Sequence, residues 1–185
     1  MIRTVALLIA LAAALPVQAA EFNAVDPAHS SVGFVYKQMG VPVDGRFKKF
    51  SVQLAFDPAK PAAARATIDI ELASVDTGSP EGDDEVAGKQ WFNTKAFPTA
   101  RFVSTAVKAL GGNRYEVTGQ LTIKGRTREV TAPFSFAAQG SGAAFDGGFV
   151  LKRADFAIGE GVWADFGTVA NEIQIKFHVL AMAGK

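Results

Sequence analysis

Residues 113–136, NRYEVTGQLTIKGRTREVTAPFSF, predict the fold of this chain, because they describe one β-hairpin with a single apolar face. Apolar and polar side chains alternate along both halves, which is the two-residue period of half-buried strands. The inward row consists of Tyr115, Val117, Gly119, Leu121 and Ile123 in the first half, and Val130, Ala132, Phe134 and Phe136 in the second. The segment therefore predicts two antiparallel strands that turn the same face to an interior.

A glycine in the middle of the hairpin predicts where the chain turns. A two-residue loop at 125–126, with glycine in the first central position of a type II′ turn, pairs Lys124 with Thr127. The same register places Gly119 opposite Ala132. Two small residues facing each other leave room on the inner face of the hairpin.

The same alternation recurs along the rest of the chain and predicts an all-β fold. Six further segments read as strands, namely 31–37, 51–56, 65–72, 101–110, 145–151 and 172–179. Turn signals separate them, which favours an antiparallel barrel or sandwich, and a closed barrel leaves no apolar strand exposed at a sheet edge. Eight strands give a barrel whose interior is either packed solid or holds one small ligand.

Two positions complicate this pattern. Pro133 cannot donate a backbone hydrogen bond, so we expect the ladder to end or to bulge near it. In segment 101–110, two rows of residues could face the interior. One row is Phe102, Ser104 and Ala106, and the other is Val103, Thr105 and Val107. The pattern alone does not set the register.

Two segments between the strands break the alternation. Within 76–97, Ser79 is an N-cap, Pro80 takes the first helical position and Gly88 ends the run, so this segment predicts one short helix. Segment 154–171 has no period at all, and a connection of this length in a small β domain is typically a lid or a binding loop.

The N-terminus resembles a secretory signal peptide. Arg3 precedes an apolar run of 11 residues, 5–15, and Val17-Gln18-Ala19 followed by Ala20-Glu21 provides a small-residue cleavage site. The run is well short of the roughly 20 residues that span a bilayer. We therefore expect residues 1–20 to be removed, residues 21–185 to form one domain, and the mature protein to be periplasmic, without a membrane-inserted segment.

Composition excludes several classes of function. Without Arg3 the mature chain has 18 basic and 18 acidic residues, so it has no long-range attraction for nucleic acid. It contains no cysteine, and hence no disulfide, thiolate nucleophile or cysteine-ligated metal. Fifteen phenylalanines against two tyrosines and two tryptophans favour either a well-filled core or an apolar cavity.

We find no catalytic motif and no metal-binding motif. The two histidines, His29 and His178, are far apart in the sequence, and the strand pattern turns His178 to solvent. The acidic run 83–85 lacks the ligand spacing of a calcium loop and reads as a helix start. No cofactor is expected.

A few polar residues lie where the rim of a barrel would be. His29 belongs to the turn DPAHS, in which aspartate and serine side chains bond the local backbone, and it is also a candidate contact at a pocket mouth. Arg46 lies near a strand end. Arg153 continues an inner row, so its charge either reaches the rim or pairs with an acid such as Asp155.

Six short motifs, in order, resemble those of the YceI-like family of exported polyisoprenoid-binding proteins. They are Asp26-Pro27-x-His29-Ser30 with Val32-x-Phe34, Gly45-x-Phe47, Trp91-Phe92 with Pro98 and Phe102, Gly119-x-Leu121-Thr122-Ile123-Lys124-Gly125, and Lys152-Arg153-x-Asp155-Phe156. The resemblance covers the whole mature chain. It implies a lipocalin-like, extended eight-stranded antiparallel barrel with a short helical insertion, whose interior holds a long-chain isoprenoid or a similar amphiphile.

The resemblance also implies a set of ligand contacts. The apolar lining is expected to include Phe34, Tyr36, Phe47, Ile68, Ile70, Trp91, Phe92, Phe102, Gly119, Phe134, Phe149 and Trp163. The head-group candidates are His29, Arg46, Arg153 and Asp155. On this interpretation the chain is a carrier or sequestering protein for a hydrophobic molecule, and not an enzyme.

The chain departs from the family pattern at one place. Many members carry Arg-Asp-x-His-Leu before a Phe-Phe pair, whereas this chain has Gly82-Asp83-Asp84-Glu85-Val86 before Trp91-Phe92. Without that arginine and histidine the head group differs, which favours a neutral quinone-like ring over a pyrophosphate. This version resembles the branch associated with membrane-bound b-type cytochromes, so such a cytochrome and a second copy of the chain are candidate partners.

Two other functions are open at this point. One is a secreted enzyme acting on a lipid or envelope component, with His29 as acid or base, and it needs a nucleophile or carboxylate beside that histidine. The other is a ligand-free module that docks on a membrane partner, which an interior packed solid would favour.

Overall fold

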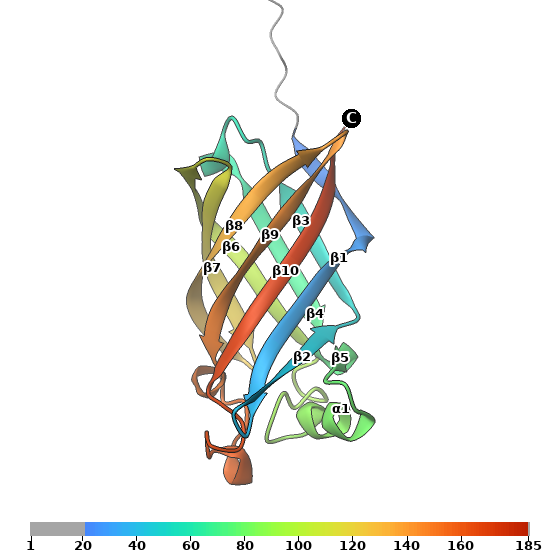
Figure 1. The fold of residues 1–185 in the computed structure, drawn as a ribbon, viewed down its shortest axis with the longest axis vertical. Coiled ribbons are helices and arrows are strands. Elements are labelled where there is room, and N and C mark those ends of the chain that lie inside the picture. Colours follow the sequence, from blue (N-terminus) through green and yellow to red (C-terminus); the bar gives the residue numbers. More distant parts are fainter. Residues whose placement is uncertain (1–20, 185) are drawn as a thin grey trace, which may run out of the picture.

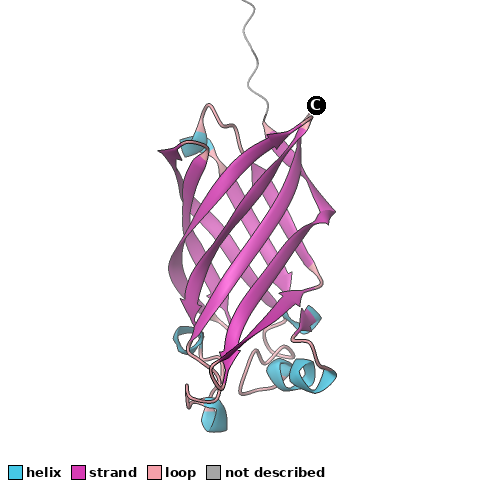
Figure 2. Ribbon diagram, in the orientation of Figure 1, coloured by secondary structure: helices cyan, strands magenta, loops and turns pink. Residues whose placement is uncertain are grey.

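The computed structural model describes residues 21–184, which form one antiparallel barrel capped at one end by helical segments (Figures 1 and 2). The strands are β1 (Phe22–Gln38), β2 (Val41–Phe47), β3 (Phe50–Ala55), β4 (Arg65–Glu71), β5 (Val75–Asp76), β6 (Thr99–Gly111), β7 (Arg114–Ile123), β8 (Arg126–Gln139), β9 (Gly142–Lys152) and β10 (Glu172–Ala183). The helix is α1 (Pro80–Ala87), and the 3-10 helices are η1 (Pro61–Ala63), η2 (Leu72–Ser74), η3 (Arg153–Phe156) and η4 (Gly161–Trp163). The signal-peptide prediction for residues 1–20 lies outside the described residues.

The sheet closes because β2 and β3 together act as one strand of the barrel, and β4 and β5 together act as the next. β2 and β3 are separated by two residues, and β4 and β5 by η2. Phe47 of β2 lies opposite Val75 of β5, and Phe50 of β3 opposite Ile70 of β4. The ladder therefore runs from β1 through β2/β3, β4/β5, β6, β7, β8 and β9 to β10, which pairs again with β1.

The fold class is as predicted, an all-β antiparallel barrel with a short helical insertion, but the structure has ten strands where the sequence predicted eight. The two interruptions account for the excess, because each divides one long curved strand. The short strands β2 and β5 were missed because their alternation is too short to be recognised. Segments 31–37 and 101–110 are in turn parts of longer strands.

The hairpin forms, but its predicted register is wrong by two residues. The chain turns at Lys124 and Gly125, whose φ angles are 50° and 72°. Ile123 pairs with Arg126, and Gly119 consequently lies opposite Val130 and not Ala132. Positive φ at both central residues defines a type I′ turn, which suits the strand twist as well as the predicted II′ turn does. A shift by two keeps every side chain on its predicted face.

Pro133 ends one ladder and leaves the other intact. It pairs with Glu116 of β7 without a register shift. On its other side, the ladder between β8 and β9 begins only at Phe134, opposite Gly147. The predicted end or bulge of the hairpin ladder is therefore wrong, because β7 and β8 stay in register through Pro133.

A β-bulge explains why the pattern of segment 101–110 was ambiguous. The register of β6 against β7 shifts between Ser104 and Ala106. Before the bulge Ser104 is buried and Val103 exposed, and after it Val107 is buried. The extra residue exchanges the two faces, so each of the competing rows is the inner row for part of the strand.

The helical prediction is confirmed in detail. Ser79 caps α1 by accepting a hydrogen bond from the backbone N–H of Gly82 at 3.0 Å, Pro80 is the first helical residue, and Gly88 is the C-cap. Segment 154–171 contains η3 and η4 and no strand. Two long connections, called the excursions below, are residues 77–98 between β5 and β6 and residues 153–171 between β9 and β10. Both lie at the same end of the barrel, together with the turn between β1 and β2 (Figure 1).

Two buried apolar clusters occupy the interior. One, at the end that carries the chain termini, is built around Phe22, Phe56, Tyr115, Phe136 and Phe145, whose rings lie 5.1–6.4 Å apart. The other includes Trp91, Phe156, Ile158 and Val169 from the two excursions, beside inner residues of the strands. The barrel is therefore closed by aromatic packing at one end and by the excursions at the other.

Candidate functional site

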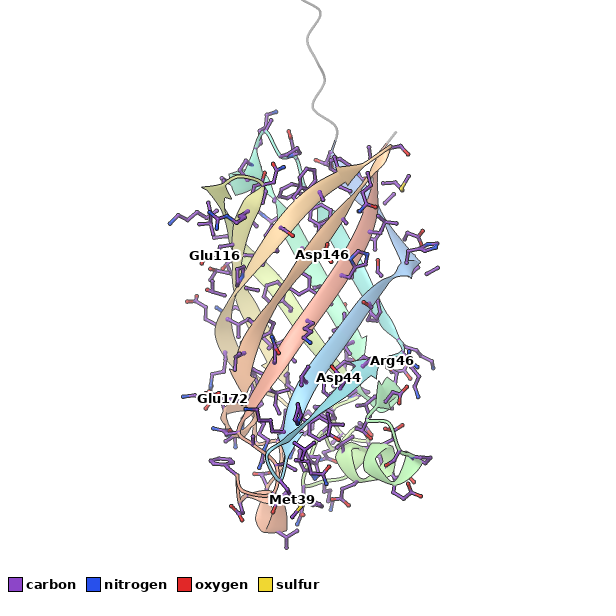
Figure 3. All side chains as sticks on the ribbon, viewed as in Figure 1. Met39, Asp44, Arg46, Glu116, Asp146 and Glu172 are labelled. Carbon is purple, nitrogen blue, oxygen red and sulfur yellow. The ribbon has the colours of Figure 1, made fainter. Side chains whose placement is uncertain are left out.

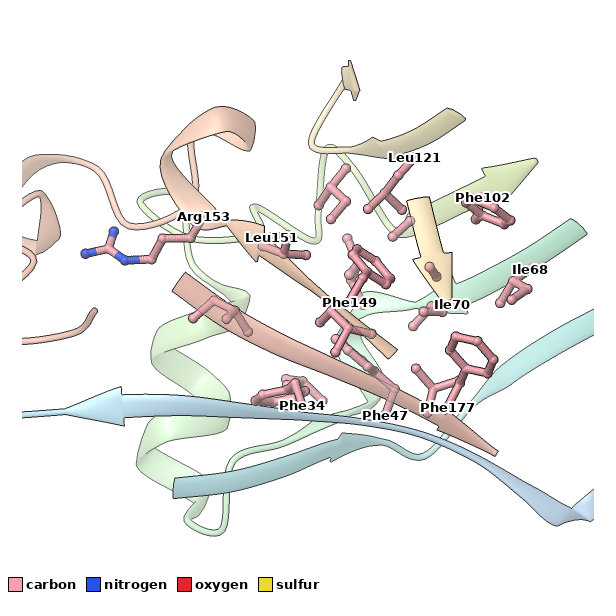
Figure 4. Close-up of a pocket in the computed structure, with 18 of the residues that line it drawn as sticks. Phe34, Phe47, Ile68, Ile70, Phe102, Leu121, Phe149, Leu151, Arg153 and Phe177 are labelled. Atoms are coloured by element: carbon pink, nitrogen blue, oxygen red, sulfur yellow. The ribbon is translucent and has the colours of Figure 1, made fainter. Parts of the chain in front are cut away.

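The barrel contains an apolar cavity of about 300 Å³. Side chains from the inner rows of β1, β4, β6 and β9 converge on it, as Figure 4 shows for Phe34, Ile68, Ile70, Phe102 and Phe149. The interior is therefore neither packed solid nor fully open, because packed clusters close its two ends and leave space between them. A cavity with such a wall suits the hydrophobic part of a small molecule.

The structure brings eleven of the twelve predicted lining residues to this cavity. They are Phe34, Tyr36, Phe47, Ile68, Ile70, Trp91, Phe92, Phe102, Phe134, Phe149 and Trp163. Further lining residues belong to the same inner rows, among them Val52, Leu121, Leu151, Ile175 and Phe177. Alternation along the strands was enough to identify these as well.

Gly119 is the exception, because it does not line the cavity. A Cβ atom on Gly119 would lie 2.5 Å from the ring of Phe102 and 2.5 Å from the carbonyl oxygen of Val103. The phenylalanine ring therefore occupies the space that the glycine leaves. A leucine at this position would meet backbone, so it would disturb the sheet instead of reporting on a ligand.

Four of the polar lining residues gather at the end of the cavity next to α1. They are Tyr36 and Gln38 of β1, Thr77 after β5, and Glu85 of α1. Burial, and secondarily the negative charge of Asp83, raises the pKa of the Tyr36 hydroxyl above its usual value. An amphiphile in this barrel would place its polar part here and its tail among the phenylalanines.

Hydrogen bonds tie the two excursions to each other and to the hairpin turn. Trp163 donates its indole N–H to Glu85 at 2.7 Å. Lys124, 8% exposed, donates from Nζ to the carbonyl oxygens of Lys89 and Ala157 and to Glu160, at 2.7–2.9 Å. These contacts join three segments distant in sequence into one cap over the cavity.

Arg153 lies beneath this cap and is only 1% exposed. Its side chain extends away from the cavity centre (Figure 4) and donates five hydrogen bonds of 2.7–3.2 Å, to the carbonyl oxygens of Ile158, Gly159, Trp163, Val169 and Ala170. The guanidinium also lies over the rings of Trp91 and Phe166, at 5.4 and 5.0 Å. Burial lowers the pKa of Arg153.

The structure corrects both predictions for Arg153. All five donors are used by backbone carbonyls of segment 158–170, so the guanidinium neither reaches the rim nor pairs with Asp155, which is exposed. Arg153 lies in the cavity wall, but all five of its N–H donors are already hydrogen-bonded. Its role is to shape the loop, which sequence spacing alone does not reveal.

The other head-group candidates lie away from the cavity. His29, with 72% of its side chain exposed, bonds Asp26 at 2.8 Å at an irregularity inside β1, where the side chains of Asp26 and Ser30 bond local backbone as predicted. Arg46 lies on the outer surface, where it pairs with Asp76 at 3.1 Å (Figure 3). His178 also faces outward, as predicted, and bonds Asp146 at 2.6 Å.

Two residues that sequence reasoning passed over belong to the site. Gly82 and Glu85, at the positions where the chain departs from the family pattern, both line the cavity. Glu85 was interpreted as a helix-start acid, although the departure itself was a signal. Within residues 21–184, no group of three or more potential metal ligands comes together, and no helix is both long and apolar enough to cross a membrane.

Fold and cavity together define a class of protein, the small antiparallel barrels of lipocalin type that enclose an apolar binding space. Residues 24–181 match the family described as the YceI-like domain. This chain belongs to the YceI-like family.

Named relatives and solved structures agree with this assignment. A UPF0312 protein of Azotobacter vinelandii is 32% identical over 158 residues, which are 82% of this chain and 80% of the relative. The crystal structure of BcnA from Burkholderia cenocepacia is 51% identical with a TM-score of 0.84, and the match covers 85% of this chain and 99% of BcnA. A polyisoprenoid-binding domain from Saccharophagus degradans has the same fold, with a TM-score of 0.68 at 16% identity, over 90% of this chain and 99% of that domain.

Proposed function

We propose that this protein is an exported carrier or sequestering protein that holds a long-chain isoprenoid, an isoprenoid quinone or a similar amphiphilic lipid. The observation that carries the proposal is the apolar cavity of about 300 Å³ inside the barrel, with a group of uncharged and acidic polar residues at the end next to α1. Such an arrangement matches a molecule with a long apolar tail and a small polar head.

Burial of the tail supplies enough free energy for binding. Each buried CH₂ contributes about 0.8 kcal/mol, so a tail of twenty carbons contributes on the order of 15 kcal/mol. Association and ordering oppose this with roughly 4–15 kcal/mol. A lipid can therefore bind without a charged partner, which fits a site whose buried arginine is already fully hydrogen-bonded.

The relatives support the same ligand class. The Saccharophagus neighbour is itself named a polyisoprenoid-binding domain, and the shared fold extends that ligand class to this chain as a proposal. Periplasmic location rests on the signal-peptide pattern of residues 1–20. A b-type cytochrome partner and a homodimer rest on sequence resemblance alone.

The alternative functions have less support. Among residues 21–184, the side chain that hydrogen-bonds His29 is Asp26, three residues away, and neither residue lines the barrel cavity. An enzyme built on His29 would have to bind its substrate on an open surface. The cavity likewise argues against a module that works without a ligand.

Native mass spectrometry of the protein purified from the periplasm of its own organism tests the proposal. We expect a non-covalent adduct that is lost on organic extraction and is identified in the extract as an isoprenoid lipid. A spectrum without adduct, combined with no uptake of added isoprenoid alcohol or ubiquinone by the extracted protein, would refute the proposal.

A further inference from the structure

The polar end of the cavity carries a carboxylate. Glu85 lines the cavity, and its Oε1 atom accepts the hydrogen bond from the indole of Trp163. Its second oxygen has no hydrogen-bond partner in the part of the chain described by the structure. Glu85 also lies in the last turn of α1, where the helix dipole is negative. A ligand group at this end therefore meets a negative potential.

A second acid strengthens this potential. Asp83 accepts hydrogen bonds from the backbone N–H and hydroxyl of Thr77, at 2.7 and 2.8 Å, which fixes it beside the cavity wall. Its charge is felt by the Tyr36 hydroxyl, whose pKa it helps to raise after burial itself. Tyr36 and Gln38 are thus neutral hydrogen-bonding groups in an acidic setting.

The two cationic residues that line the cavity do not neutralise this negative potential. Arg153 uses all five donors on backbone carbonyls, and an anion could reach it only by leaving one of these carbonyls unpaired. Arg65, the other cationic lining residue, begins β4 at the opposite end and donates to Ala62 and Ala64. Within residues 21–184, no free cation lines the polar end of the cavity.

We propose that Glu85 makes the cavity select uncharged head groups over anionic ones, so that the ligand's head carries hydroxyl or carbonyl groups at Tyr36, Gln38 and Glu85, and no phosphate. This inference rests on the proposed function, which places the tail inside the barrel. A phosphate would be held near the like charge of Glu85, whose side chain is exposed at this end of the cavity, and the repulsion opposes its binding. A hydroxyl or carbonyl group meets no such repulsion and finds hydrogen-bonding partners.

Two lipids with the same tail separate head-group selection from tail binding. The chain has two tryptophans, Trp91 and Trp163, and both line the cavity, so tryptophan fluorescence reports directly on its occupancy. Geranylgeraniol and geranylgeranyl phosphate are titrated at pH 7.5, below their micelle concentrations. We expect the alcohol to bind at least about tenfold more tightly, because like-charge repulsion acts on the phosphate alone.

The variant Glu85→Gln removes the charge and keeps an oxygen that can accept the Trp163 hydrogen bond. Its control is Glu81→Gln, which removes an equal charge from an exposed position of α1 outside the cavity. We expect E85Q to change the ratio of the two affinities in favour of the phosphate by roughly fivefold or more, and E81Q to change this ratio by less than about twofold.

Each outcome has one meaning. The inference is overturned if the phosphate binds the wild-type protein as tightly as the alcohol, or if E85Q and E81Q change the ratio equally. If neither lipid binds, it is the proposed function that fails.

Discussion

Arg153 shows how a single buried residue can organise a loop. Its five hydrogen bonds reach carbonyls between residues 158 and 170, so one side chain satisfies five backbone acceptors of the second excursion. An inner-row arginine predicts a buried charge, but only the folded loop shows that carbonyls, not an acid, compensate it. The planar guanidinium, with donors in a fixed fork, is suited to this task in a way that an ammonium is not.

We predict that Arg153→Lys destabilises the protein by roughly 2–4 kcal/mol, because an ammonium has three donors for five carbonyls and each buried carbonyl left unpaired costs about 1–3 kcal/mol. The free energy of unfolding from urea denaturation measures the loss. Lys152→Arg, at the exposed neighbouring position, is the control and should change stability by less than about 0.5 kcal/mol. If the two substitutions changed the free energy of unfolding equally, the five hydrogen bonds of Arg153 to backbone carbonyls would not be what stabilises the protein.

For single residues, the sequence predicted which face of a strand a side chain occupies, but not whether a polar residue near a strand end reaches the cavity. Phe34, Ile68 and Phe149 were placed correctly in the cavity wall because alternation fixes the face of a residue. His29 and Arg46 were misplaced as cavity contacts, because a position near a strand end does not tell which way a turn folds.

The cap is the element on which access to the cavity depends. Lys124 belongs to the hairpin turn, yet its ammonium binds both excursions, through Lys89 and through Ala157 and Glu160. The hydrogen bond and charge of Lys124 hold the pKa of the Glu160 carboxyl below its usual value. The pair therefore links cap stability to pH.

The sign of this dependence follows from the lowered pKa. A carboxyl with a lowered pKa stabilises the folded state above its unfolded pKa, near 4.5, and this stabilisation is lost as the pH falls through the folded-state pKa. We predict that Glu160→Gln lowers the melting temperature by roughly 1–3 °C at pH 7, since the pair is partly exposed.

The same comparison at acidic pH provides the test. The difference in melting temperature between E160Q and wild type should shrink below pH 4.5 and vanish once Glu160 is protonated in both states. Glu172→Gln, at an exposed position on β10, is the matched control and should show no such dependence. A difference that stays constant down to pH 3 would contradict the ion-pair account.

The elements themselves were largely predictable. The helix was fixed by Ser79, Pro80 and Gly88, which act locally through the backbone. The hairpin register was not, because a type II′ turn at 125–126 and a type I′ turn at 124–125 keep the same faces and both place Gly125 at positive φ, and positive φ at Lys124 is what marks the observed turn. The β6 bulge and the two interrupted strands are likewise consequences of barrel curvature, which acts between elements distant in sequence.

The whole molecule consists of a barrel with two packed ends and an open middle. The phenylalanine content of the sequence was compatible with a filled or a hollow interior, and both occur. Phe22 and Phe136 pack in the closed end without lining the cavity, whereas Phe34, Phe102 and Phe149 border it. Side-chain alternation cannot tell these cases apart, because whether opposite walls touch depends on the width of the closed barrel.

The most direct test of the account fills the cavity from its wall. Ile68→Trp adds bulk to an inner residue of β4, and Gln53→Trp adds the same side chain at an exposed position of the neighbouring strand β3. Native mass spectrometry after incubation with geranylgeraniol measures uptake. We predict that Gln53→Trp binds the lipid as the wild type does and that Ile68→Trp, still folded by circular dichroism, loses at least about nine-tenths of the adduct. Undiminished uptake by folded Ile68→Trp would contradict the claim that the lipid lies inside the barrel.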